Sequence, residues 1–260
     1  MKPIHTERRR NIIVASSLGV LTLALSLALY VGGIGMGFPT RIRALAETIL
    51  YNTYNPWNVT LTSYSLNAVS AIIWDYRGID TIFETTVLLA SITAVTVILK
   101  EKGPSNSGSS ITLISKFTTR LVLLITLLIS ISTAVNGHLT PGGGFQAGAM
   151  ITTGIILSLA VFFSSFSRYS YFSRKENLLL LRYLVLTAIS VVALLPVLVD
   201  AKAYVMQNQS KPTAPFSMPT WFIDTPLAGS ILVFNVLEAI AVAFALSYTI
   251  IILLESCTNN

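Results

Sequence analysis

The chain has 260 residues, of which 53% are hydrophobic and only 11% are charged. About a quarter of the residues in a soluble domain are charged, so this composition indicates an integral membrane protein. The single cysteine, Cys257, provides no intramolecular disulfide and no iron–sulfur ligand set. Two histidines are too few for a haem or zinc site, and we therefore expect no cofactor and no bound metal.

Six apolar segments approach or exceed the length of about 20 residues that a helix needs to cross a bilayer. They predict an all-α, polytopic membrane protein with helices at residues 12–36, 79–99, 117–135, 145–166, 183–199 and 227–254. The first segment follows the sequence ERRR. It is longer than the apolar core of about 7–15 residues in a cleaved signal peptide, which favours an uncleaved membrane anchor.

The basic residues predict how these helices are oriented. With the N-terminus in the cytoplasm, 12 of the 17 lysines and arginines lie inside, and the five outside are Arg41, Arg43, Arg77, Lys202 and Lys211. This follows the positive-inside rule, predicts that both termini are inside, and explains the net charge without a nucleic-acid partner. Trp57, Trp74 and Trp221 all fall on the outer side, where aromatic residues suit the membrane interface.

A polar stretch of Gly, Pro and Ser at residues 103–110 is the clearest linker in the chain. It separates a two-helix module, residues 1–102, from a four-helix module, residues 111–260. The predicted outer loop between residues 39 and 74 is long and rich in Asn, Thr and Tyr.

The most distinctive motif is NGHLTPGGGFQAG, residues 136–148, between the third and fourth predicted helices. Gly137 suits a left-handed helix cap, Pro141 ends the preceding helix, and Gly142 and Gly143 permit unusual backbone angles. Gly144 and Gly148 form a small-xxx-small pair that allows close approach of another helix. By itself the motif predicts a tight helical hairpin, in which His138 is a loop histidine hydrogen-bonded to the backbone.

The stretch GHLTPGGGFQAG also closely resembles the signature of the B subunit of Mrp-type (Mnh-type) cation/proton antiporters. It is similar to the matching subunits of archaeal membrane-bound hydrogenases and sulfur-reducing complexes as well. The resemblance covers residues 110–256, including GSILVFNVLEAIAVAFAL in the last helix, and departs at Ala147, where a third glycine is expected. Residues 72–89, with the core DYRGIDT, resemble the C-terminal part of the Mrp A subunit. The chain therefore looks like a fusion of two neighbouring subunits.

Two acidic positions within the predicted spans are candidates for an ion path. Glu238 lies about 16 Å into the last helix, near the membrane midplane, and Asn235 shares its face. Charged residues at this depth cost about 2.5–3.5 kcal/mol and usually mark function. The alternative is a protonated or hydrogen-bonded glutamate that fixes helix packing.

The second candidate is a stripe of charges at the start of the second predicted helix. Arg77, Asp80 and Glu84 follow one another at i, i+3 and i+7 and share one face. They form either an entry point where cations or protons meet an acidic pair, or a salt-bridge cluster stabilised by the arginine. His138, at the outer mouth, could exchange protons because histidine has a pKa of about 6.5.

The resemblance implies a non-catalytic subunit of a multisubunit Na⁺/proton antiporter module in the plasma membrane of a prokaryote. The module either stands alone or is part of a hydrogenase-type respiratory complex, and its partners are other Mrp-type subunits, Na⁺ or H⁺, and the bilayer. Pumping subunits of this superfamily carry Lys/Glu pairs at the midplane, and the predicted spans here contain no such lysine. A structural adaptor with no groups on the ion path is the alternative function.

The predicted orientation can be tested with single cysteines at Ser107 and Ser210 in a Cys257→Ser background. An impermeant thiol reagent applied to intact cells should label position 210 and not position 107, because only the former lies outside. The opposite labelling pattern would overturn the orientation.

Overall fold

The computed structural model describes residues 4–31, 42–98, 112–166, 175–222 and 225–257. The helices are α1 (Ile4–Tyr30), α2 (Ala44–Thr53), α3 (Ala68–Ala71), α4 (Gly78–Ile98), α5 (Leu113–Val135), α6 (Gly144–Phe166), α7 (Lys175–Val199) and α8 (Ser230–Cys257). A π-helical turn, η1 (Ile72–Tyr76), joins α3 to α4, and the two short strands β1 (Trp221–Phe222) and β2 (Thr225–Pro226) pair antiparallel. The predicted linker at 103–110 lies outside the described residues.

The six long helices confirm the expected all-α membrane fold. Within the described residues, four segments are long and apolar enough to cross a bilayer: Ile12–Tyr30, Leu113–Val135, Leu180–Val199 and Ser230–Leu253. The apolar part of α6, Gly144–Leu159, is shorter. The 21 residues of α4 correspond to about 32 Å of helix, which matches a hydrocarbon core of about 30 Å.

The chain divides into two compact units, residues 1–47 and 48–260. In the first unit, the segment Ile12–Tyr30 of α1 is strongly apolar and has no buried residues. Such a helix is soluble only in lipid or against another protein.

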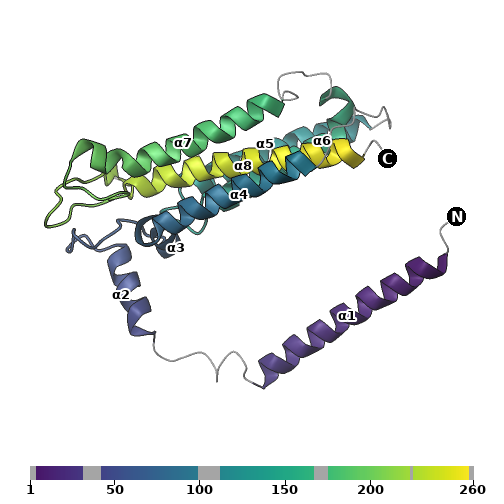
Figure 1. Ribbon diagram of the computed structural model, residues 1–260, viewed down its shortest axis with the longest axis horizontal. Coiled ribbons are helices and arrows are strands. Elements are labelled where there is room, and N and C mark those ends of the chain that lie inside the picture. The colour runs from purple at the N-terminus through teal and green to yellow at the C-terminus, as the bar shows by residue number, and fades with distance from the viewer. Residues whose placement is uncertain (1–3, 32–41, 99–111, 167–174, 223–224, 258–260) are drawn as a thin grey trace. The chain divides into compact units, whose positions relative to one another are not determined.

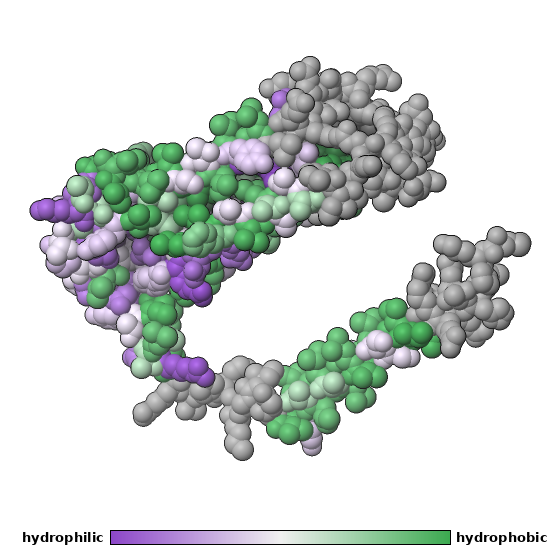
Figure 2. Space-filling view, in the orientation of Figure 1, coloured by the Kyte–Doolittle hydropathy of each residue, from purple (hydrophilic) through white to green (hydrophobic). Residues whose placement is uncertain are grey.

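In the second unit, α8 is the central helix and packs against α4, α5, α6 and α7. Figure 1 shows α8 between α7 and α4. The starts of α4, α6 and α8 meet the ends of α5 and α7 at one end of the bundle, which we call the hairpin end. Figure 2 shows apolar side chains over most of the bundle flank, with polar ones gathered toward this end.

Small residues bring α6 and α8 into backbone contact. A Cβ atom added at Gly148 would lie 2.7 Å from the carbonyl oxygen of Ala239 and 2.7 Å from Cβ of Val242. Ala147, where the family pattern expects glycine, is fully buried and forms a cluster with Ala134 and Ala239. Small residues therefore line the contact between α6 and α8, and alanine fits at position 147.

Two details of the hairpin differ from expectation. The helix α5 ends at Asn136 with ordinary φ and ψ angles of −95° and 7°, and the left-handed φ falls on Gly142, at 144°, instead of Gly137. Gly137 is needed for space, because a Cβ atom there would lie 3.0 Å from Nδ2 of Asn235 and 3.1 Å from Cα of Gly143. Pro141 is exposed in the turn before α6.

Trp74 is buried in the core instead of facing the membrane interface. Its side chain is 1% exposed and stacks on Phe234, with ring centroids 4.7 Å apart and an interplanar angle of 12°. Trp57 and Trp221 are 92% and 48% exposed. The difference arises because η1 folds back onto α8 and carries Trp74 inward.

The last helix begins three residues later than predicted, at Ser230. Ala228 and Gly229 have left-handed φ angles of 53° and 59°, which interrupt the helix. The side chain of Asn208 then accepts hydrogen bonds from the backbone N–H and the hydroxyl of Ser230, at 3.0 and 3.3 Å. This capping satisfies a donor that the helix leaves free at its start.

The α6–α8 contact leads to a stability prediction. Gly148→Ala should lower the free energy of unfolding by about 1–3 kcal/mol, the usual cost of overpacking a tight contact. The matched control is Gly154→Ala on the same helix. There the added Cβ would have one atom within 3.5 Å, the flexible Cδ1 of Leu123 at 3.0 Å. Unfolding of the detergent-solubilised protein by dodecyl sulfate measures both, and equal effects would contradict the proposed contact.

Candidate functional site

A cavity of about 310 Å³ lies at the hairpin end, among α4, α6, α8 and η1. Two carboxylates line it, Glu84 from α4 and Glu238 from α8. The two glutamates are far apart in the sequence, yet they lie close enough to repel each other electrostatically. The other lining residues are Ser70, Ile73, Thr81, Thr85, Leu88, Gly142, Gly143, Gly144, Phe145, Gln146, Asn235 and Val242.

Glu238 sits against the first turn of α6. A Cβ atom at Gly144 would lie 2.5 Å from Oε2 and 2.6 Å from Cβ of Glu238, so only glycine fits there. The backbone N–H of Phe145 is directed at the carboxylate. The first N–H groups of a helix lack partners within the helix and carry a partial positive charge. The start of α6 therefore stabilises an anion at the position of Glu238.

Asn235 is 1% exposed and ties η1 to α8. Its Oδ1 accepts a 3.1 Å hydrogen bond from Nε1 of Trp74. Its Nδ2 lies beside the hairpin glycine Gly137 and has no hydrogen-bond partner in the described part of the chain. Asn235 thus lines the cavity next to Glu238, but its oxygen holds Trp74 in place.

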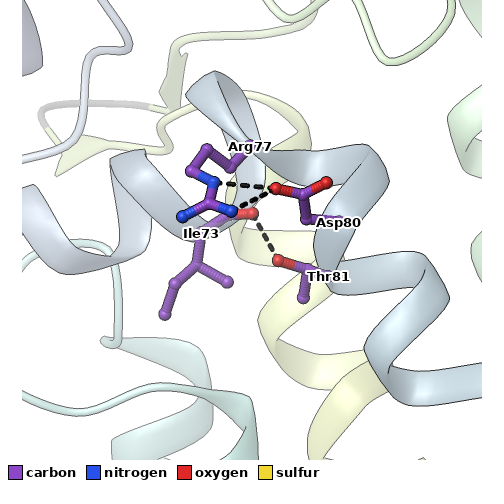
Figure 3. A network of polar contacts seen from close by, with 4 residues as sticks. All are labelled: Ile73, Arg77, Asp80 and Thr81. Carbon is purple, nitrogen blue, oxygen red and sulfur yellow. Dashed lines mark hydrogen bonds and ion pairs between the residues drawn. The ribbon is translucent and has the colours of Figure 1, made fainter. Parts of the chain in front are cut away.

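The stripe of Arg77, Asp80 and Glu84 is divided between the surface and the cavity. Nη2 and Nε of Arg77 lie 2.5 and 2.8 Å from Oδ2 of Asp80, and the two side chains are 70% and 59% exposed. Figure 3 shows this ion pair beside the 2.7 Å hydrogen bond from the Thr81 hydroxyl to the carbonyl of Ile73. The acidic pair in the cavity is therefore Glu84 with Glu238, and Asp80 is neutralised outside it.

Glu84 is exposed although it also lines the cavity. The cavity is consequently open on the α4 side, at a depth of about 9 Å along that helix. An exposed carboxylate on a membrane-spanning helix is costly in lipid, so this opening suits contact with another subunit or with water.

His138 is buried away from the cavity. Its side chain is 2% exposed, and Nε2 lies 2.8 Å from the carbonyl oxygen of Pro226, to which a neutral imidazole donates. Burial lowers the pKa of His138 below its ordinary value, and this outweighs the opposite effect of the hydrogen bond to the carbonyl of Pro226. The geometry is that of the backbone-bonded loop histidine, one of the two interpretations of the motif.

Asn67 and Ser70 hold the hairpin, and sequence reasoning missed both. Nδ2 of Asn67 donates to the carbonyls of Gly137, Thr140 and Gly142 at 2.7, 2.9 and 3.2 Å. The Ser70 hydroxyl donates to the Gly137 carbonyl at 2.6 Å. The only local signal is that Asn67 precedes a short helix, whose N–H of Val69 it also caps.

The buried, neutral His138 leads to a pH prediction. In the unfolded chain this residue binds a proton below about pH 6.5, whereas in the folded chain its lowered pKa means that protonation requires a lower pH. The free energy of unfolding should therefore fall as the pH drops through 6.5, by at most about 1.4 kcal/mol per pH unit. His138→Gln keeps a donor for Pro226 and cannot titrate, so its unfolding should depend less on pH. Equal pH slopes would show that His138 contributes nothing to this dependence.

Comparison with known proteins agrees with this architecture. An uncharacterized protein of Methanocaldococcus jannaschii is 32% identical over 151 residues, which cover 49% of this chain and 58% of that protein. A chain of the membrane-bound sulfane sulfur reductase, an archaeal respiratory membrane complex, has the same fold with a TM-score of 0.66 and 24% identity, covering 93% of this chain and 98% of that one.

A chain of the Mrp complex from Dietzia sp. also shares the fold, with a TM-score of 0.59 and 21% identity. The match covers 95% of this chain and 26% of the Dietzia chain. Residues 114–248, more than half of the protein, match the family described as the domain related to the MnhB subunit of Na⁺/H⁺ antiporters. The chain belongs to this MnhB-related family of membrane proteins.

Proposed function

We propose that the chain is a non-catalytic membrane subunit of a cation/proton antiporter-type complex, and that its cavity holds a cation or proton in transit. The observation that carries this proposal is the convergence of Glu84 and Glu238, from different helices, in one cavity within the bundle. Ionisable groups at membrane depth usually mark ion pathways. The match to the MnhB-related family supports the same function.

The cavity has the chemistry of a monovalent cation site. Two carboxylates that repel each other are stabilised when a cation or a proton lies between them. Thr81 and Thr85 add hydroxyl oxygens to the lining, and each donates its proton to a backbone carbonyl, at 2.7 and 2.8 Å. Their oxygen lone pairs therefore remain available to a cation, and Na⁺ prefers such hard oxygen ligands.

The partners we propose are other Mrp-type subunits in the plasma membrane of a prokaryote. The cavity is open at Glu84, so the chain alone does not enclose a path across the membrane. The similar folds in an Mrp complex and in an archaeal respiratory complex support both a free antiporter and a respiratory assembly. The stretches 1–102 and 111–260, joined at 103–110, would correspond to two fused subunits.

A structural adaptor is the second candidate function, and the surroundings of Glu238 favour it. The carboxylate faces the N–H of Phe145 and fills the space left by Gly144. A side chain in this position fixes α8 against α6 whether or not an ion passes.

Glu238→Gln distinguishes the two functions, because glutamine keeps the shape and cannot ionise. If the cavity is on the ion path, the complex should assemble normally and lose most cation-dependent pH change in inverted vesicles. Glu84→Gln should likewise assemble and lose most of the transport, and Glu238→Asp should retain more transport than Glu238→Gln.

The matched control is Glu47→Gln, which removes an exposed carboxylate in α2 and should leave transport unchanged. Vesicles must contain equal amounts of assembled complex, as judged on native gels. Full transport in Glu238→Gln and Glu84→Gln together would remove the cavity from the mechanism and leave the adaptor function.

A further inference from the structure

Arg182, in α7, is a fully buried cation that the proposed ion site does not use. Its side chain is 1% exposed. Nη2 donates to the carbonyl of Leu89 at 2.8 Å and to the hydroxyl of Thr93 at 3.0 Å, and the guanidinium carbon lies 5.7 Å from the ring centroid of Tyr248. Nε and Nη1 are buried without a hydrogen-bond partner in the described residues.

The charge of Arg182 is uncompensated within the described part of the chain, whose one ion pair is Arg77–Asp80. A guanidinium stays protonated in proteins, and a buried charge without a counter-ion is strongly destabilising. The two hydrogen bonds to α4 require an N–H donor but no charge, and a neutral side chain could make them. Within the described residues, helix packing therefore accounts for an N–H donor at this position and does not require its positive charge.

The helix α4 connects Arg182 to the cavity. Glu84, Thr85 and Leu88 line the cavity, and Leu89 and Thr93, which bind Arg182, follow on the same helix. Thr93 lies about 13 Å along α4 from Glu84, away from the hairpin end. The cavity and Arg182 thus follow one another along the line of contact between α4 and α8, which we call the α4–α8 seam.

Apolar side chains surround Arg182 beyond the cavity, and two of them, Leu89 and Tyr248, belong to residues that contact it. Leu89, Ile92, Ala245, Tyr248 and Ile252 form one buried cluster, and Leu88 packs against it. On α8, Val242 lines the cavity directly before this cluster. A cation moving from the carboxylates along the seam would lose its oxygen ligands and then approach a fixed positive charge.

We propose that Arg182 is an electrostatic barrier that closes the α4–α8 seam to cations on one side of the cavity. An ion that reaches Glu84 and Glu238 then leaves only through the open α4 side, toward a neighbouring subunit. Fixed positive charge excludes cations from other membrane pores in this way. Arg182 is a specificity-determining residue in this arrangement, and the inference rests on the proposed function of the cavity.

The test is passive Na⁺ efflux from liposomes that contain the assembled complex, without an imposed pH gradient. Arg182→Gln should increase the efflux roughly tenfold, the factor expected from a unit charge at the position of Thr93, about 13 Å along α4 from Glu84, at an effective dielectric constant of about 20. Arg182→Lys keeps the charge and should stay near wild type. The matched control is Arg120→Gln, which removes an exposed arginine of α5. Efflux from assembled Arg182→Gln equal to wild type would overturn the proposal.

A second pair of variants tests the charge while retaining the arginine. Thr93→Asp places a carboxylate beside Nη2 and should increase the efflux as Arg182→Gln does, because the barrier is neutralised. Thr93→Asn has nearly the same size without the charge and should not. If Arg182→Gln fails to assemble, the two Thr93 variants test the proposal in its place. Equal efflux from Thr93→Asp and Thr93→Asn would overturn the proposed barrier.

The double variant Arg182→Gln/Glu238→Gln separates this inference from the proposed function. Efflux through the cavity should fall back in the double variant, because the carboxylate no longer attracts cations. Undiminished efflux would mean that the leak bypasses the cavity, which overturns the barrier and leaves the proposed function intact. Loss of transport in Glu238→Gln alone tests only the proposed function.

Discussion

The backbone contact between α6 and α8 is the constraint on which the rest of the structure depends. Without side chains at Gly144 and Gly148, the two helices approach until the carbonyl of Ala239 nearly touches the α6 backbone. This approach brings Glu238 to the start of α6, where free N–H groups favour an anion. It also makes α8 the central helix, so that α4 and α7 pack on its remaining faces. A side chain at position 144 would collide with the carboxylate itself.

Much of the helical arrangement was predictable because long apolar segments identify membrane helices with little ambiguity. The glycines and the proline of NGHLTPGGG predicted the hairpin after Val135 and a helix from residue 145, and the observed start of α6 at Gly144 agrees to within one residue. The start of α8 was placed too early because its interruption depends on Ala228, a residue without a turn preference, held in a left-handed conformation. Such strain comes from the surrounding loop and leaves no local signal.

The candidate site was predictable only as separate residues. Depth within a helix identified Glu238 and a charged stripe identified Glu84, but hydropathy contains no information on which helices are neighbours. The pairing of α4 with α8 therefore appeared only in the structure. The sequence spacing also grouped Asp80 with Glu84, whereas the free rotation of an exposed arginine lets Arg77 bind Asp80 alone. The roles of Asn67 and Arg182 depend entirely on contacts across about 70 to 93 residues of sequence.

The stacking of Trp74 on Phe234 gives the protein a built-in optical reporter. The indole N–H is bonded to Asn235, which itself lines the cavity one helical turn from Glu238. Indole emission shifts with the electric field around the ring, so a charge entering or leaving the cavity acts on this fluorophore through a single hydrogen bond. The other two indoles, at Trp57 and Trp221, are exposed and can be replaced by phenylalanine without touching the bundle core. The occupancy of the cavity then becomes a spectroscopic quantity, observable in the isolated chain without an added label.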